Sequence, residues 1–179
     1  MKKLQLEELK RDDLKTYKRK KKLPVVLVLD NIRSLNNVGS AFRTGDAFSI
    51  DKIFLCGITG APPHKDINKT ALGAQMSVDW EHHSSTAACI KLLKEQGFKI
   101  AIVEQIDKSI YLQNMTFVSS EKYALVLGNE VTGISDDVLP LADFAIEIPQ
   151  FGTKHSLNVS VSIGVVLWDY MSKIGISNL

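Results

Sequence analysis

Three short segments of the chain carry glycines and polar residues in patterns that suit a binding or catalytic site. The first is residues 37–44, in which Asn37, Gly39 and Arg43 follow a short apolar run. Gly39 permits close approach of another backbone, and we expect the side-chain oxygen of Asn37 to cap a helix. The guanidinium of Arg43 is a fixed charge whose planar donors suit a phosphate or a carboxylate. Taken alone, the segment is also typical of a capped helix with one surface arginine.

The second segment, residues 127–135, is a polar turn bracketed by Gly128 and Gly133, and it contains Glu130. Backbone donors and acceptors in such a turn can meet a small ligand. No G-K-[ST] follows it, and no G-x-G-x-x-G occurs anywhere in the chain, so the turn is neither a P-loop nor a dinucleotide fingerprint. An ordinary strand-to-helix turn is the alternative interpretation.

The third segment, residues 148–162, joins a strand to a long apolar stretch. We expect the strand to end at Pro149, the loop to turn at Gly152, and Ser156 to cap the next helix. The letters S-L-N-V-S-V-S alternate as in a strand, but the apolar run that follows favours a helix over 157–174. Polar groups buried at such a helix start cost free energy unless they find partners, and a functional site would supply them.

Short apolar strands that alternate with helices must position these segments. Together they predict an α/β domain with a mainly parallel sheet. Ligands bind such sheets at the carboxyl ends of the strands. We therefore expect the site in loops 30–37, 104–107, 128–135 and 149–156. The predicted strands are 24–29, 52–56, 99–103, 123–127 and 145–148, and the predicted helices are 38–48, 86–96 and 157–174.

The charge of the chain is unevenly distributed. The net charge is +2, yet residues 1–22 carry ten Lys/Arg and four Asp/Glu. We predict a basic, charged helix or extension over 1–22, followed by one domain over 23–179. Lysine and arginine contacts release counterions from nucleic acid, so a phosphate-rich partner is one explanation. A solvated tail that only aids solubility is the other.

Composition excludes several classes of protein. No run of 18 apolar residues and no secretory leader occur, so we expect no membrane span and a cytoplasmic location. Cys56 and Cys89 are expected to be buried thiols rather than a disulfide framework. The four histidines show no ligand spacing, so we expect no metal site.

In order and spacing, the three segments resemble the motifs of the SpoU/TrmH family of RNA ribose methyltransferases, over about residues 24–173. The chain departs from the usual pattern at Gln150, where the family often has Met; backbone atoms dominate that loop, so we expect little consequence. The matching residues are Asn37, Gly39, Arg43 and Thr44; Gly128, Asn129, Glu130 and Gly133; and Ile148, Pro149, Gly152 and Ser156–Ser160.

The resemblance implies a fold and an activity. The fold would be an α/β sheet with helices on both faces and a deep trefoil knot near the carboxyl terminus, and the protein would be a homodimer through the knotted region. The cofactor would be S-adenosylmethionine (SAM), and the methyl acceptor a ribose 2′-hydroxyl of RNA. Transfer RNA is preferred on domain size, and ribosomal RNA is the alternative. A non-catalytic RNA-binding protein on the same fold is a second alternative, but the retained Arg43, Glu130 and Asn158 argue against it.

The resemblance also implies roles for particular residues. Arg43 matches the favoured catalytic residue, and because the pKa of arginine lies above about 12, we expect it to stabilise charge and align groups rather than act as a base. Glu130 is a rival general base, so the identity of the base stays open. Gln105 is a further candidate for the cofactor pocket. Those expected to hold SAM are Gly128, Ile148 and Leu157, and those expected to position the ribose are Asn37, Glu130, Ser156 and Asn158.

Overall fold

The computed structural model describes residues 1–9 and 11–175, and its strands form one seven-stranded sheet. Every pair of neighbouring strands is parallel, in the order β3-β2-β1-β6-β4-β7-β5. The predicted parallel sheet is therefore confirmed, and all carboxyl ends of the strands lie at one edge. The strands are β1 (Leu23–Asp30), β2 (Ile50–Cys56), β3 (Asp79–His83), β4 (Phe98–Val103), β5 (Ile110–Tyr111), β6 (Lys122–Leu127) and β7 (Phe144–Glu147).

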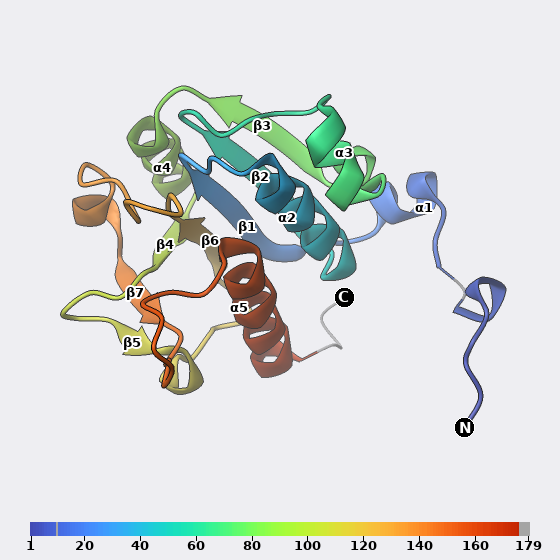
Figure 1. Cartoon of the computed structure of the whole chain (residues 1–179). Coiled ribbons are helices and arrows are strands. Elements are labelled where there is room, and N and C mark those ends of the chain that lie inside the picture. Colours follow the sequence, from blue (N-terminus) through green and yellow to red (C-terminus); the bar gives the residue numbers. More distant parts are fainter. Residues whose placement is uncertain (10, 176–179) are drawn as a thin grey trace.

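Helices cover both faces of the sheet (Figure 1), as the sequence predicted. One face carries α2, α3 and α5, and the other carries α4. The α-helices are α1 (Leu14–Arg19), α2 (Leu35–Ala47), α3 (Lys65–Ala71), α4 (Thr86–Glu95) and α5 (Val159–Ile174). Short 3-10 helices are η1 (Leu6–Leu9), η2 (Ala74–Met76), η3 (Leu112–Asn114) and η4 (Leu139–Leu141).

The central strand β1 shows why the sheet needs both layers. Successive side chains of a strand point to opposite faces. Val25, Leu27 and Leu29 pack into the core under α2, α3 and α5, whereas Val26 and Val28 pack into the core under α4. Because both faces are buried, the run lacks the alternation of a half-exposed strand and is apolar throughout, which is typical of a strand covered on both sides.

Two predicted helix caps are wrong, and both errors move the helix start. The N-cap of α2 is Ser34, whose hydroxyl accepts from the N–H of Asn37, so Asn37 lies in the first turn of the helix. The N-cap of α5 is Asn158, whose side chain accepts from the N–H of Ser160. Ser156 lies in the loop before it and is exposed. In each helix the capping residue is the one whose side-chain oxygen accepts from an unpaired backbone N–H in the first turn.

Residues 1–22 were predicted to form a helix or an extension, and the described part of this segment is not one continuous helix. It contains η1 and the six-residue α1, and α1 buries no residue. A helix without an apolar face gains little from packing, and short helices are marginal without it. Among the described residues, no helix is long and apolar enough to cross a membrane. Cys56 and Cys89 are buried free thiols, as predicted.

Candidate functional site

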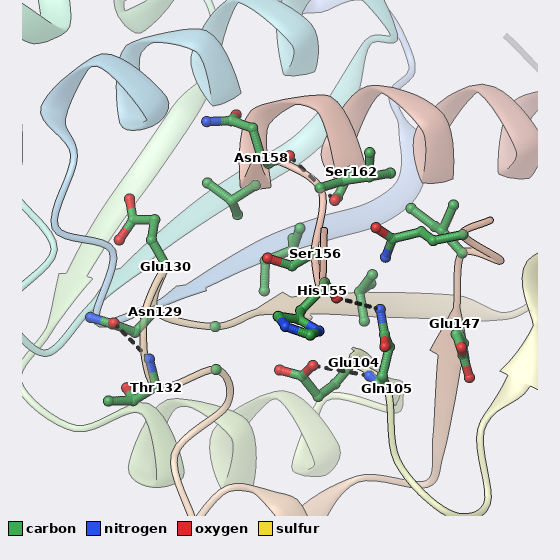
Figure 2. A pocket seen from close by; sticks show the side chains of 18 of the residues that line it. Glu104, Gln105, Asn129, Glu130, Thr132, Glu147, His155, Ser156, Asn158 and Ser162 are labelled. Carbon is green, nitrogen blue, oxygen red and sulfur yellow. Dashed lines mark hydrogen bonds between the residues drawn. The ribbon is translucent and has the colours of Figure 1, made fainter. Parts of the chain in front are cut away.

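A cavity of about 530 Å³ opens at the carboxyl edge of the sheet (Figure 2). Residues that follow β4, β6 and β7 line it, together with the start of α5. Three of the four loops expected to form the site, 104–107, 128–135 and 149–156, contribute to its walls. The fourth, 30–37, contacts the cavity through Glu130 rather than lining it.

The cavity is acidic. Glu104, Glu130 and Glu147 line it, and the described lining contains no lysine or arginine. Glu104 accepts hydrogen bonds from the backbone N–H groups of Ile134 (3.2 Å) and Gln105 (2.9 Å). These bonds fix the carboxylate in place. Such a cavity repels phosphate groups and favours a ligand that carries positive charge.

The polar turn after β6 is compact because two of its residues are glycines. A side chain at Gly128 would place its Cβ 2.3 Å from the backbone of Gly133 and Ile134. Gly133 has a φ of +70°, which favours glycine. The N–H and C=O groups of Asn129 bond to those of Gly133, and this closes the turn. Gly128 is therefore required for the shape of the cavity wall.

Glu130 joins this turn to the start of α2. Its carboxylate accepts from the N–H of Arg33 (2.9 Å), the N–H of Ser34 (3.1 Å) and the side-chain amide of Asn37 (2.9 Å). Burial raises the pKa of Glu130, but the hydrogen bonds together outweigh it and leave this pKa below its ordinary value of 4.5. Glu130 is therefore ionised near neutral pH and is a weak base.

The hydrogen-bond chain continues from α2 to α5. The amide of Asn158 donates to the side-chain oxygen of Asn37 at 3.2 Å. The same Asn158 oxygen that caps α5 also accepts from the hydroxyl of Ser160 at 2.6 Å. Glu130, Asn37 and Asn158, one from each of the three sequence segments, thus form one connected polar chain.

A buried carboxylate beneath the site holds two loops together. Asp30, the last residue of β1, is fully buried and accepts from the hydroxyl of Thr86 and from the N–H of Ser135 (2.8 Å). The amide of Asn31 donates to the same carboxylate, while the amide of Asn129 donates to the Asn31 carbonyl at 2.7 Å. The turn after β6 is thereby tied to the end of β1.

The remaining predicted site residues divide into two groups. Ile148, Leu157 and Ser156 line the cavity, as do Gly128 and Asn158. Arg43 lies outside the lining and is exposed on α2. Within the described chain its guanidinium has no hydrogen bond or ion pair, so it is available to an external anion.

Several lining residues were not singled out from the sequence. They include Glu104, Glu147 and His155, and Gln105 was named only as a further candidate. The amide of Gln105 donates to the carbonyl of His155 at 3.0 Å, a contact that joins the loop after β4 to the loop before α5 (Figure 2). Their position directly after or at the end of a buried strand is the signal that could have found Glu104 and Glu147.

Comparison with known proteins shows which protein family this chain resembles. Residues 24–168 match the model of the SpoU rRNA Methylase family. A protein of Borreliella burgdorferi, named as an uncharacterized tRNA/rRNA methyltransferase, is 32% identical over 163 residues, which cover 91% of this chain and 70% of that protein. This chain spans between 56% and 70% of the length of several curated relatives.

Solved structures agree in fold. An AdoMet-bound rRNA methyltransferase from Sinorhizobium meliloti superposes with a TM-score of 0.75 and 23% identity, over 84% of this chain and 60% of that one. A structure that describes the 2-OH methylation of C/U34 on tRNA superposes with a TM-score of 0.69 and 26% identity, over 81% of this chain and 92% of that one. Since the family model covers most of the residues and includes all three motif segments, the chain belongs to the SpoU rRNA Methylase family.

Proposed function

We propose that the chain transfers a methyl group from SAM to a ribose 2′-hydroxyl of RNA. The observation that carries the proposal is the connected polar chain Glu130–Asn37–Asn158 beside an acidic cavity. It brings all three sequence motifs to one place. Membership of an RNA methyltransferase family supports the reaction class.

The cavity fits SAM on its charge. SAM carries a sulfonium and an ammonium group, and Glu104, Glu130 and Glu147 line a cavity that holds no basic side chain other than His155 among its described lining. When bound, SAM supplies a methyl group already activated for transfer. The turn 128–133 and the residues Ile148 and Leu157 would hold its adenosine part, because exposed backbone and apolar side chains suit a flat ring.

The chain's own residues have the task of placing the acceptor. Asn37 and Asn158 are joined by a side-chain hydrogen bond, which fixes the directions of their remaining donors and acceptors and would suit them to position a ribose. Glu130 accepts three hydrogen bonds and has a lowered pKa, so we assign it to positioning Asn37 rather than to accepting the proton. Ser156 lies at the cavity wall and would contact the same ribose.

Arg43 would stabilise the charge that develops on the ribose oxygen. A 2′-hydroxyl is a very weak acid, so its reaction needs nearby positive charge or a base. Arg43 is exposed and has no partner in the described structure, which leaves its donors for the ribose oxygen or a neighbouring phosphate.

Transfer RNA is the substrate that we favour. The tRNA-related structure matched above is covered over 92% of its length by this chain, at 26% identity. The rRNA methyltransferase from Sinorhizobium meliloti is covered over 60% of its length, at 23% identity. The decisive experiment is methylation of separated transfer and ribosomal RNA with labelled SAM, followed by mapping of the modified nucleotide. Label on a base, or no label on either RNA, would overturn the proposal.

We further propose that the chain divides functionally into an RNA-contacting extension, 1–22, and a methyltransferase domain, 23–179, with a carboxyl-terminal trefoil knot. The knot is what the family resemblance implies, and two features accommodate it: β6 lies between β1 and β4, and α5 begins against α2. Segments far apart in sequence are thus interleaved at the site. A backbone trace from a crystal structure tests the knot directly.

A homodimer through α5 completes the proposal. Val161, Val165 and Trp168 are exposed along one side of α5, and Trp168 is 60% exposed. A shallow hollow of about 440 Å³ lies beside them, between α5 and Pro149. An exposed apolar helix face of this kind typically marks an interface. Trp168→Glu should therefore convert a dimer to a monomer in sedimentation analysis, and a wild-type monomer would refute the dimer.

A further inference from the structure

A second cavity, of about 510 Å³, lies at the amino-terminal edge of the sheet. The first residues of β1, β2 and β6 line it, and α1 with the residues after it forms one wall. Since the strands are parallel, this edge is opposite the acidic cavity. β1 has eight residues, so at about 3.3 Å each the two edges are roughly 25 Å apart. One small ligand cannot fill both cavities.

This second cavity is basic, in contrast to the first. Its described lining contains five lysines and only two aspartates, an excess of three positive charges. The lysines come from three parts of the chain: the α1 segment, β2 and β6. They are Lys18, Lys20, Lys22, Lys52 and Lys122.

Two of these lysines lack a carboxylate partner within the described structure. Lys22 is half-buried, donates to the carbonyl of Tyr17 at 2.8 Å and lies over the Tyr17 ring. Lys122 lies 5.4 Å from the centre of the Phe98 ring. Burial lowers the pKa of Lys22 despite several nearby aspartates. An added anion would relieve that cost.

The wall that carries the lysines is docked on the domain. The hydroxyl of Tyr17 donates to the carbonyl of Asp46, near the end of α2, at 3.0 Å. Burial raises the pKa of Tyr17 to about 12. Lys18 also approaches Asp79 at 3.6 Å. The lysines of this segment are therefore held near β2 and β6 and do not extend freely into solvent.

We propose that this lysine-lined cavity binds backbone phosphates of the substrate RNA, in a stretch remote from the nucleotide that is methylated. The proposal rests on the proposed function for the identity of RNA as substrate. Lysine ammonium groups act as flexible point charges for phosphate and read no base. The wide separation of the two cavities means that only an RNA long enough to span the sheet engages both.

The first test compares two double variants that lose the same charge. Lys22→Ala with Lys122→Ala removes both lysines without carboxylate partners, whereas Lys69→Ala with Lys91→Ala removes exposed lysines of α3 and α4. Affinity for bulk transfer RNA is measured against salt. We expect the first pair to lower affinity roughly tenfold at low salt and to reduce the salt slope by about 1.4 to 1.8, since each phosphate contact contributes about 0.7 to 0.9. The control pair should change neither.

Two outcomes would overturn the proposal: equal losses in both double variants, or no change in the first. Because Lys22 is half-buried, Lys22→Arg with Lys122→Arg serves as a second variant that keeps both charges. It should retain the wild-type salt slope. Thermal unfolding of each variant shows whether a lower affinity merely reflects a loss of structure.

The second test does not depend on catalysis. A lysine-acylating reagent and mass spectrometry measure the accessibility of Lys22 and Lys122 in the full chain. Bulk transfer RNA should protect both, and it should leave Lys69 and Lys91 reactive. Protection by inorganic phosphate but not by RNA would overturn the proposal. If RNA protects the lysines but is not methylated, this site stands and the proposed reaction fails. Methylation of RNA without protection of the lysines would overturn this site and leave the proposed reaction standing.

Discussion

The two cavities at opposite edges of the sheet hold opposite charges, and they hold them by different means. At the carboxyl edge, backbone N–H groups fix Glu104 and Glu130 through hydrogen bonds. At the amino edge, Lys22 and Lys122 have aromatic neighbours and no carboxylate partner in the described structure. Fixed groups suit the exact placement of a small cofactor. Ammonium groups without a carboxylate partner suit a polyanion whose phosphates must be held without regard to sequence.

This difference predicts that salt affects ligand binding at the two cavities differently. Exposed charges are screened beyond about 10 Å at 0.1 M salt, and counterion release weakens nucleic-acid binding further. Hydrogen bonds such as those of Glu130 depend on contact and are less affected. Added salt should therefore weaken RNA binding while SAM binding stays nearly constant.

The largest effect is expected at Arg43, which belongs to neither cavity lining. Arg43→Ala should lower the rate of methylation by about 10²- to 10³-fold, the usual cost of losing one group that stabilises developing charge. SAM affinity, measured by calorimetry, should stay nearly unchanged because Arg43 does not line the cavity. Lys69→Ala, which removes a charge from α3, is the control. Full activity of Arg43→Ala would remove this residue from the mechanism.

A smaller effect, on SAM affinity, is expected from a substitution in the turn that shapes the acidic cavity. In Gly128→Ala the new Cβ would meet backbone at 2.3 Å, and such overpacking costs about 1–3 kcal/mol. SAM binding should weaken by about tenfold or more. Gly152→Ala is the matched control, because nothing lies within 4 Å of its Cβ. Equal SAM affinity in both variants would show that the turn tolerates a shift and does not set the cavity's shape.

The sequence predicted the five strands with strongly apolar segments, and it missed two others. β3 (D-W-E-H-H) is an edge strand with mostly exposed side chains, so it lacks the apolar run that marks a buried strand. β5 has only two residues. The missed helix α3 buries only Ile67 and Ala71, and its packing against α2 depends on Gly39. A tertiary contact of this kind leaves no local periodicity in the sequence.

The site could be predicted only in part, because some of its contacts join residues far apart in the sequence. The loops that end buried strands were found, and so were Gly128 and Asn158. The hydrogen bond from Asn158 to Asn37 joins residues 121 positions apart, which no local pattern encodes. The cap of α2 was misplaced because Asn37 is a good capping residue type whose side chain is instead engaged by Glu130. Long-range partners thus decided between local alternatives.

Removal of residues 1–22 should weaken RNA binding at the amino edge of the sheet and leave the cavity at the carboxyl edge unchanged. The deletion removes Lys18, Lys20 and Lys22, three of the five lysines of the basic cavity, and leaves β1 intact. RNA binding should weaken by several fold, and its salt slope should fall by about 0.7 to 0.9 for each phosphate group that is no longer bound. SAM affinity should not change. If RNA affinity and slope both stay the same, the segment is a solubility device and the contrast between the edges loses its functional meaning.

The smallest effect is expected from Glu130→Gln: a loss of stability at neutral pH that disappears in acid. The folded-state pKa of Glu130 lies below 4.5, so its ionised form stabilises the fold above that pH and the contribution is lost as the pH falls through the folded-state value. The wild type should therefore lose stability on acidification more steeply than the variant. Chemical unfolding at pH 7 and at about pH 3.5, at low and at high salt, measures this difference.

Comparing unfolding at low and at high salt also tests the contrast between the acidic cavity and the basic cavity. Glu130 is held by three hydrogen bonds, so its contribution at pH 7 should persist when salt is raised. By contrast, the loss of RNA affinity caused by the lysine substitutions at the amino edge should disappear when salt is raised. If salt removes both contributions alike, the carboxylates of the acidic cavity act only through long-range charge. The cavity's preference for a cationic cofactor would then weaken as salt is raised.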